Sequence, residues 1–253
     1  MENNYNPFSL AGKSVLVTGA SSGIGRAIAI ECSRMGAKVL LTARNKDRLE
    51  ETLSLMENQE CHHIILGDLS KEEDLSAIVD SISDPLDGLV QCAGFTIPKP
   101  FQFFSEREID AVMGVNFKAP VLLTQLLLKK KKLRKDCSVV FISSISGTLV
   151  SYVGSSVYSA SKGAINGLLK GLAIELASKS IRVNSISPGM INTHILDGGE
   201  ITEEQLREDV RHYPLGRYGE PEEVAYAAVY LLSNASRWMT GSNILIDGGY
   251  TLL

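Results

Sequence analysis

Short apolar runs that alternate with longer amphipathic segments restrict most strongly how this 253-residue chain can fold. The runs include VLV within 13–18, VLL within 38–42 and VVFI within 138–143. Apolar residues at consecutive positions are typical of strands that are buried on both faces of a sheet. Strands that alternate with helices predict βαβ units. We therefore expect an α/β fold: one domain over 1–253, with a doubly wound parallel sheet covered by helices on both faces.

The expected elements follow this alternation along the whole chain. Strands are predicted over 13–18, 38–42, 63–66, 88–92, 138–143, 181–187 and 242–246. Helices are predicted over 24–35, 46–57, 71–82, 105–133 and 156–177, with a break near Pro120. Ligands bind beyond the carboxyl ends of the strands in open sheets of this kind. The residues that follow each strand are therefore the candidates for chemistry.

Three glycines, Gly19, Gly23 and Gly25, follow the first expected strand and lead into a helix. Glycine permits positive φ and a close backbone approach to a ligand. The helix start behind it offers unpaired N–H groups and partial positive charge. The turn therefore predicts a pyrophosphate site, and the alternative is a plain tight turn. The predicted contacts in this turn are Gly19, Ser21, Ser22, Gly23, Ile24 and Gly25.

The same turn also matches GxSxG, the nucleophile elbow of serine hydrolases, with Ser21 as the nucleophile. His194 or His212 would then serve as the base. Gly25 has no function in that interpretation, and the elbow would fall early in the chain. The hydrolase hypothesis is kept as the minor alternative.

Arg44 and Lys46 follow the second expected strand, where a cofactor with a free ribose 2′-hydroxyl would favour a carboxylate. Arg44 can hold a 2′-phosphate through bidentate hydrogen bonds, so we expect NADP(H) rather than NAD(H). The alternative is that both cations belong to a solvated helix start. After the third strand, Asp68 and Leu69 are expected at the adenine ring, although Asp68 is equally suited to cap the next helix.

Tyr158 and Lys162 lie four residues apart in an expected helix, so both side chains share one face. An ammonium group favours a phenolate, so we expect Lys162 to lower the pKa of Tyr158 from about 10 and make it a general acid and base. Ser144 follows the fifth expected strand, and its hydroxyl can donate to a carbonyl oxygen. The alternative for the first two residues is an exposed helical pair.

Taken together, these motifs resemble the short-chain dehydrogenase/reductase family over essentially the whole chain. The matching pieces are Thr18-Gly19-x-x-x-Gly23-x-Gly25, Asp68, Ala93-Gly94, Asn116, Ser144, Tyr158-x-x-x-Lys162, Pro188-Gly189 with Thr193, and Asp247-Gly248-Gly249.

The resemblance implies a Rossmann fold and a carbonyl/hydroxyl oxidoreductase in which Tyr158 donates the proton. The implied catalytic tetrad is Asn116, Ser144, Tyr158 and Lys162. In that family the lysine also binds the nicotinamide ribose, and the asparagine supports a proton-relaying water. Further implied cofactor contacts are Ala93, Gly94, Pro188, Gly189, Ile191 and Thr193.

Two departures from the family pattern stand out. Gln91-Cys92 precede Ala93-Gly94 where the family usually has Asn-Asn, which puts the contacts of those asparagines in doubt. The loop 148–157 is also longer than in many relatives and can shape the substrate pocket differently.

The segment 214–224 is most similar to 3-oxoacyl-[acyl-carrier-protein] reductases, so a 3-oxoacyl thioester of fatty acid biosynthesis is the expected substrate. Another alcohol, sugar or ketone is the alternative. The basic run 129–132, with Arg134 and Lys135, can attract an acidic acyl carrier protein, or it is a solvated helix end. Gly198-Gly199 and the following charged segment predict a substrate lid around 190–215.

Composition narrows the remaining classes. A net charge of −4 gives no basic footprint for nucleic acid. The cysteines form no CxxC and the histidines no HExxH, so no metal site is expected. With no signal-peptide pattern and no long apolar run, we expect a cytoplasmic protein without membrane contact. The resemblance and the apolar C-terminus imply a homotetramer. A nucleotide-binding regulator without catalysis is the other alternative.

Overall fold

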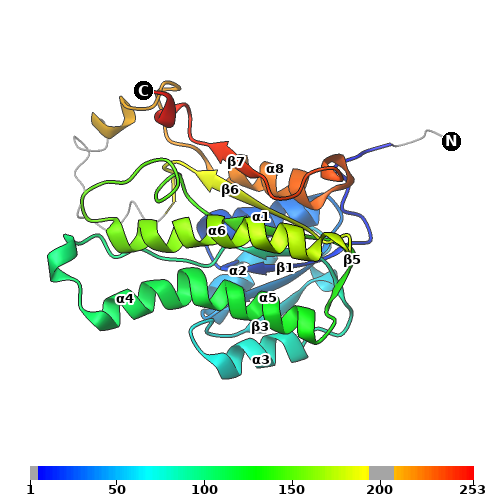
Figure 1. Cartoon of the computed structure of the whole chain (residues 1–253). Helices are drawn as coiled ribbons and strands as arrows, with labels where there is room; N and C mark the ends of the chain where they lie inside the picture. The colour runs from blue at the N-terminus through cyan, green and yellow to red at the C-terminus, as the bar shows by residue number, and fades with distance from the viewer. Residues whose placement is uncertain (1–4, 194–207) are drawn as a thin grey trace.

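The computed structural model describes residues 5–193 and 208–253, and a parallel sheet of seven strands forms its centre (Figure 1). The spatial order among the described residues is β3-β2-β1-β4-β5-β6-β7. The strands are β1 (Ser14–Thr18), β2 (Lys38–Ala43), β3 (His63–Leu66), β4 (Leu86–Gln91), β5 (Leu133–Ile142), β6 (Arg182–Pro188) and β7 (Asn243–Ile246).

The strand order reverses between β1 and β4. From β1 the chain moves outward through β2 to β3 and then crosses back to place β4 on the other side of β1. A crevice forms outside the carboxyl ends of the strands at such a reversal, and ligands bind there. The predicted doubly wound sheet is confirmed.

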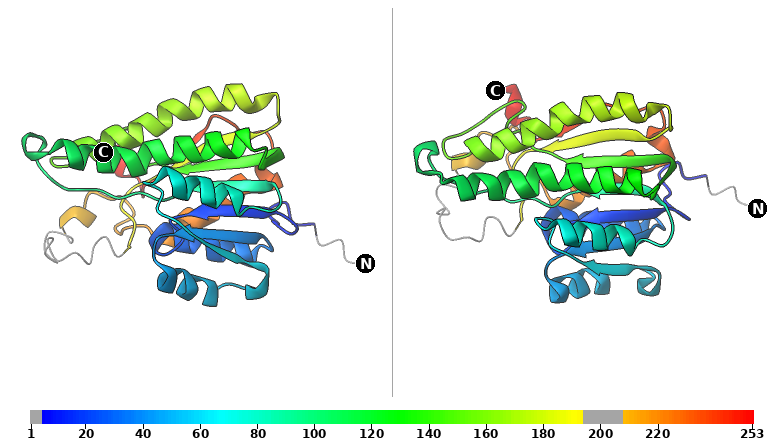
Figure 2. Two further views of the ribbon diagram at one scale, coloured as in Figure 1. Left: turned by 90° about the horizontal axis from the view of Figure 1, so that it is seen from below. Right: turned by 60° about the horizontal axis from the view of Figure 1, so that its bottom comes forward.

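Helices cover both faces of the sheet (Figure 2). One layer consists of α1 (Gly23–Arg34), α2 (Lys46–Ser54) and α8 (Pro221–Leu232), which share one apolar cluster with the sheet. The other layer contains α3 (Glu72–Asp80), α4 (Glu106–Met113), α5 (Ala119–Lys129) and α6 (Ser156–Ala177). Short helical turns are η1 (Gln59–Cys61), η2 (Phe101–Phe103), the π-helix η3 (Gly114–Lys118), η5 (Asn234–Ser236) and η6 (Tyr250–Leu252).

Alternate residues of each central strand pack into opposite layers. In β1, Val15 and Val17 join the cluster with α1 and α8, whereas Leu16 joins the cluster with α3, α5 and α6. All three side chains are fully buried. Both faces therefore need apolar residues, which explains the uninterrupted apolar runs in the sequence.

The helix predicted over 105–133 was wrong at its C-terminal end. It stops at Lys129, and Leu133 already begins β5, where it pairs with Leu86. Lys131 adopts a positive φ of 55° and turns the chain toward the sheet. The predicted break near Pro120 takes the form of the π turn η3, which separates α4 from α5 without ending the helical stretch. The other predicted elements are present, with ends that differ by a few residues.

The continuous helical stretch Glu106–Lys129 is long and apolar enough by composition to cross a membrane. Its Val112, Leu123 and Leu127 are nevertheless fully buried against the protein core. The stretch is thus a core helix of the α/β fold, with one face packed against the sheet.

Candidate functional site

The predicted catalytic residues meet at the carboxyl edge of the sheet, beside the reversal between β1 and β4. Ser144 follows β5, Tyr158 and Lys162 lie in the first half of α6, and Asn116 lies in η3. A Cβ atom on Gly94, just after β4, would lie 3.2 Å from Asn116 Oδ1 and 3.4 Å from Lys162 Nζ. The structure therefore brings together residues from four separate parts of the chain.

The turn after β1 is shaped by glycines that no other residue can replace without strain. Gly19 has φ +69°, and a Cβ there would lie 2.9 Å from Ala93 Cα. A Cβ on Gly25 would meet the carbonyl oxygen of Gly19 at 2.2 Å. Thr18 ties this turn to β4, because its hydroxyl accepts hydrogen bonds from the amides of Cys92 and Ala93.

The start of α1 faces this turn without a side-chain cap. Ser22 occupies the N-cap position in extended backbone and makes no capping hydrogen bond, and the first turn holds no acidic residue. Gly23 has φ +50°, and a Cβ there would lie 3.2 Å from the methyl carbon of Thr193. Uncapped N–H groups beside a glycine cradle fit a pyrophosphate, so these residues can hold the dinucleotide that the family uses.

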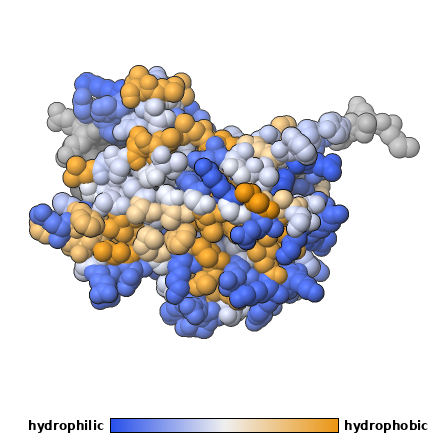
Figure 3. Space-filling view, in the orientation of Figure 1, coloured by the Kyte–Doolittle hydropathy of each residue, from blue (hydrophilic) through white to orange (hydrophobic). Residues whose placement is uncertain are grey.

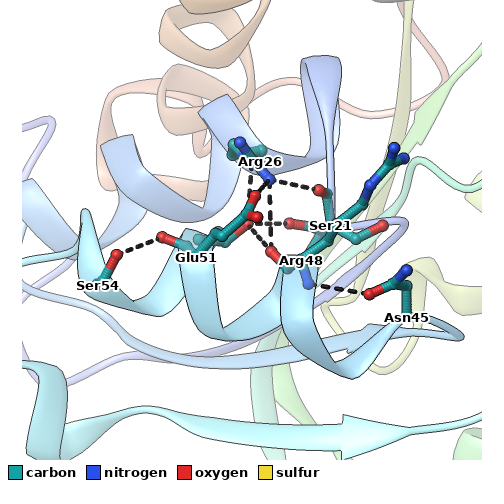
Figure 4. Close-up of polar contacts among 8 residues, drawn as sticks. Ser21, Arg26, Asn45, Arg48, Glu51 and Ser54 are labelled. Carbon is teal, nitrogen blue, oxygen red and sulfur yellow. Dashed lines mark hydrogen bonds and ion pairs between the residues drawn. The ribbon is translucent and has the colours of Figure 1, made fainter.

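Arg26 fixes the backbone of the glycine turn (Figure 4). Its guanidinium donates to the carbonyl oxygen of Ser21 at 2.8 Å and pairs with Glu51 at 2.9 Å. It also donates to the Thr52 hydroxyl at 3.1 Å. The guanidinium of Arg26 is therefore used in contacts within the protein. Other cations have to bind an anionic ligand.

Arg44 and Arg48 are two such cations. Both are exposed, and neither guanidinium has a hydrogen-bond or ion-pair partner within the described ranges 5–193 and 208–253. In Figure 4 the side chain of Arg48 extends past Ser21 toward open space. Arg44 was predicted from the sequence and Arg48 was not, although Arg48 follows it by one helical turn across the N-cap Asn45. By contrast, Lys46 pairs with Glu50 at 3.5 Å.

Asp68 does not cap α3, because the N-cap of that helix is Lys71. Its carboxylate instead accepts hydrogen bonds from the amide and hydroxyl of Ser70. Burial alone would raise the pKa of Asp68, but these bonds and the Arg44 charge together lower it. The side chain of Leu69 is buried in the core, so only its backbone can face an adenine ring.

Ser144 is oriented as a hydrogen-bond donor. Its Oγ accepts from the amide of Ser146 at 3.1 Å, which leaves its proton to donate elsewhere. The Ser144 side chain also hydrogen-bonds to Tyr158. Lys162 is buried, its Nζ donates to the carbonyl oxygen of Ile142 at 2.8 Å, and it lies 5.7 Å from the centroid of the Tyr158 ring.

The expected lowering of the Tyr158 pKa by Lys162 was wrong. Burial raises the pKa of Tyr158, and the hydrogen bond with Ser144 offsets only part of this effect. Burial also lowers the pKa of Lys162 to about 8. Burial, and not the charge of the lysine, therefore decides the direction of the Tyr158 shift.

Both ends of the Asn116 side-chain amide are hydrogen-bonded within the protein. Oδ1 accepts from the amide of Phe95 at 2.9 Å, and Nδ2 donates to the Phe95 carbonyl oxygen at 2.8 Å and to Ser161 Oγ at 3.1 Å. Its backbone carbonyl oxygen is a further acceptor. In a regular α-helix that carbonyl would accept from residue 120, but Pro120 has no N–H to donate.

Gln91 and Cys92 replace the family's two asparagines with different contacts. Gln91 Nε2 donates to the Pro120 carbonyl oxygen and to Thr124 Oγ1, each at 3.3 Å, while its buried Oε1 has no partner within the described residues. Burial raises the pKa of the Cys92 thiol to about 12, although the charge of Lys162 opposes the shift. Cys92 is therefore a neutral thiol, close enough to Lys162 for the charge of the lysine to act on it.

The segment after β6 returns to the same edge. Gly189 donates to the carbonyl oxygen of Ile246, and a Cβ on it would lie 3.0 Å from Asp247 Cα. Pro188 ends β6 in the buried sheet, and the side chain of Ile191 is buried in the core. Ile191 can therefore reach a cofactor only through its backbone. Most of the predicted lid around 190–215, and His194 with it, lies outside the described residues.

The basic run lies at the wrong edge to serve this site. It spans the end of α5 and the start of β5, so it sits at the amino edge of the parallel sheet. Lys130 pairs with Asp80 at 2.5 Å, and Lys132 donates to the carbonyl oxygen of Ile82. Arg134 lies 3.7 Å from Asp87. The alternative of a solvated, internally paired helix end fits this placement better.

A family model described as enoyl-(acyl carrier protein) reductase matches residues 19–251. A chloroplastic tropinone reductase homolog of Arabidopsis thaliana is 39% identical over 97% of this chain and 77% of its own length. A 3-oxoacyl-[acyl-carrier-protein] reductase of Rickettsia prowazekii is 34% identical, covering 96% and 99%. A glucose 1-dehydrogenase of Gluconobacter oxydans is 37% identical, covering 96% and 93%.

Solved structures show the same fold over nearly the full chain. The Pseudomonas aeruginosa RhlG/NADP active-site complex superposes with a TM-score of 0.90 at 31% identity, covering 98% of this chain and all of the other. The similarity therefore covers both the glycine turn and the residues Ser144, Tyr158 and Lys162, and it includes a protein in complex with NADP.

Proposed function

The chain belongs to the short-chain dehydrogenase/reductase family and is an oxidoreductase, and on this basis we propose that it reduces a carbonyl to a hydroxyl with NADPH. The observation that carries the proposal is the meeting of Ser144, Tyr158 and Lys162 beside a glycine turn and an uncapped helix start. A serine hydrolase needs a base beside Ser21, and no histidine bonds to Ser21 within the described residues. A regulator without catalysis would not need the polar triad.

NADPH, when bound, supplies the hydride. The Ser144 hydroxyl donates a hydrogen bond to the substrate carbonyl and holds it in place, because its own oxygen is already fixed by the Ser146 amide. Tyr158 keeps its proton because burial raises its pKa, so it can donate that proton to the forming alkoxide. Lys162 and a water on the Asn116 carbonyl would then restore the phenol proton.

Arg44 and Arg48 support a preference for NADP(H) over NAD(H). Two exposed guanidinium groups without partners in the described part of the chain, with no carboxylate directly after β2, suit a 2′-phosphate. We expect Arg44→Asp and Arg48→Asp each to weaken NADPH binding strongly and NADH binding little. Fluorescence titration with both cofactors measures this, and Arg34→Asp, on an arginine paired with Glu31 at the far end of α1, is the matched control. Equal losses for both cofactors would contradict the assignment.

The substrate we propose is a 3-oxoacyl thioester, and the apolar surface around the site supports it. Phe95, Phe101 and Phe103 in the loop after β4, and Leu149, Tyr152 and Val153 in the loop after β5, are exposed large apolar residues. The two loops meet, because the amide of Lys99 donates to the carbonyl oxygen of Gly154 at 3.1 Å. Such a rim suits an acyl chain better than a sugar. A small ketone or a sugar is the alternative.

The test follows NADPH oxidation with acetoacetyl thioesters, longer 3-oxoacyl thioesters, cyclic ketones and sugars. We expect the highest kcat/KM for a 3-oxoacyl thioester, and we expect Tyr158→Phe to abolish turnover while NADPH still binds. Tyr226→Phe, on an exposed tyrosine of α8, is the control. Near-normal turnover by Tyr158→Phe would contradict the proposed proton donor. Turnover of sugars alone would contradict the proposed thioester substrate.

Assembly into a homotetramer in the cytoplasm completes the proposal. An acyl carrier protein as a partner follows from the proposed thioester substrate and not from the basic run, which lies at the amino edge of the sheet. Helices α4, α5 and α6 form one open face, and Figure 3 shows apolar surface on this face between hydrophilic patches. Ile174 of α6 is 80% exposed on the molecule's surface. An apolar surface of this kind is typical of subunit contacts.

A further inference from the structure

Asn166 lies one turn beyond Lys162 on α6, and its side chain joins four separate segments. Nδ2 donates to Ser143 Oγ at 2.9 Å, to Thr148 Oγ1 at 2.6 Å and to the carbonyl oxygen of Lys162 at 3.3 Å. Oδ1 accepts from Ser185 Oγ at 3.1 Å. One amide thus links the end of β5, the loop after it, β6 and the helical turn that carries the catalytic lysine.

The two hydroxyls held by Asn166 pass the connection on to catalytic residues. Ser143 Oγ donates to the carbonyl oxygen of Lys162 at 3.2 Å. Thr148 Oγ1 donates to the carbonyl oxygen of Ser144 at 3.4 Å. Each hydroxyl accepts from Asn166 and donates its own proton onward, so the direction of every bond in the network is set by the amide.

The loop that carries Ser144 also contacts α6 elsewhere, through the hydrogen bond of Ser144 with Tyr158 and through Ser151 Oγ, which lies 3.1 Å from Ser159 Oγ. Asn166 is the residue that joins this loop to both β6 and the turn of Lys162. Gly147 has φ +84°, and a Cβ there would lie 1.9 Å from the carbonyl oxygen of Ser159. The backbone of the loop at Gly147 therefore packs directly on the backbone of α6 at Ser159, with no side chain between them. Farther along the loop, Leu149 and Val153 are exposed.

We propose that Asn166 is a positioning residue that fixes the Ser144 hydroxyl and the Lys162 side chain relative to each other. It acts through Ser143 and Thr148 rather than by touching the reacting atoms. The inference rests on the proposed carbonyl reduction. A displacement of about 1 Å at reacting groups lowers rates on the order of 100-fold, so a network of this kind has a measurable effect on turnover.

The test compares Asn166→Leu and Thr148→Val with Asn184→Leu. Asn184 lies on β6 and also uses both ends of its side-chain amide. It donates to the Met239 carbonyl oxygen at 2.8 Å and accepts from the Ser242 amide at 3.1 Å. Both partners precede β7, so its bonds do not reach the loop that carries Ser144. We expect Asn166→Leu to lower kcat on the order of 10- to 100-fold with an unchanged Kd for NADPH. Thr148→Val should give a smaller loss, and the double variant should be non-additive.

The pH profile separates positioning from general stability. Asn166→Leu should shift the apparent pKa values of kcat, because the surroundings of Lys162 and Tyr158 change, whereas Asn184→Leu should leave them in place. Asn166→Ser, which keeps a small polar group, provides a milder second variant, and thermal unfolding confirms that each variant folds. A wild-type kcat and pH profile in folded Asn166→Leu would overturn the proposal.

Hydrogen exchange gives a readout that needs no substrate. Amides 145–150 should exchange faster in Asn166→Leu than in the wild type, and unchanged protection there would overturn the inference. If the wild type reduces no carbonyl, the proposed function fails, and the exchange of this loop still decides whether Asn166 holds it.

Discussion

At the scale of single residues, burial governs the ionisation of Tyr158 and Lys162. It raises the pKa of Tyr158 and lowers that of Lys162 to about 8. The effect has opposite signs because the charged form of one is an anion and that of the other is a cation. Both groups are thereby held closer to their neutral forms, and a phenol that keeps its proton is suited to donate it.

Lys162 should give the stability of the protein a distinct pH dependence. Between about pH 8 and about pH 10 the unfolded chain still carries the lysine proton that the folded chain has released. Stability rises with pH wherever the unfolded state binds more protons. We expect the free energy of unfolding in urea to rise over this window relative to Lys162→Met. Parallel pH curves for the two proteins would contradict the lowered pKa.

Some site residues could be identified from sequence spacing alone and others could not. Gly19 and the pair Tyr158 and Lys162 stand at fixed distances from an expected strand or within one helix, and the structure places them together at one edge. Arg48 and Asn166 were missed, because an exposed arginine and a helical asparagine have no distinctive pattern. Their surroundings come from chain segments that are distant in sequence.

At the scale of elements, the π turn η3 and the proline after it prepare the backbone of Asn116. The amide of Ala119 donates to the carbonyl oxygen of Gly114, which is the wider spacing of a π turn. Pro120 stands in the first turn of α5, where a proline is tolerated. Pro120 cannot donate to the carbonyl of Asn116, which suits that carbonyl to accept from a water, and π turns of this kind are frequent at functional sites.

Pro120→Ala should therefore separate stability from activity. The alanine supplies an N–H that can close onto the carbonyl of Asn116, and alanine is the better helix former. We expect an equal or higher Tm and a several-fold lower kcat. Pro85→Ala, directly before β4 at the amino edge of the sheet, is the control and should leave kcat unchanged. A kcat at the wild-type value in Pro120→Ala would rule out this function of the proline.

At the scale of the whole molecule, one layer of helices leaves apolar surface uncovered. The stretch Glu106–Lys129 has a mean hydropathy of 1.5 over its most apolar window, yet only 39% of that window is buried. Ile174 on the neighbouring α6 is exposed as well. A second copy of the chain packed on this face would remove both from water.

Ile174→Asp should accordingly disturb assembly without unfolding the chain. Sedimentation is expected to give a tetramer for the wild type and smaller species for the variant, because a buried unpaired charge opposes association. Leu55→Asp, on the exposed end of α2 in the other layer, is the control. A stable wild-type monomer would contradict the predicted assembly.

Local spacing along the chain was enough to predict the layered α/β architecture, the glycine turn and the pairing of Tyr158 with Lys162. These features depend on apolar runs, on positive φ at glycines and on the turn of one helix. The end of α5 could be located only in the folded chain, since Leu133 joins the sheet by pairing with Leu86. Folding also reversed the expected pKa shift of Tyr158 and placed the basic run at the far edge. Burial and long-range pairing set these properties, and neither is encoded in the spacing of neighbouring residues.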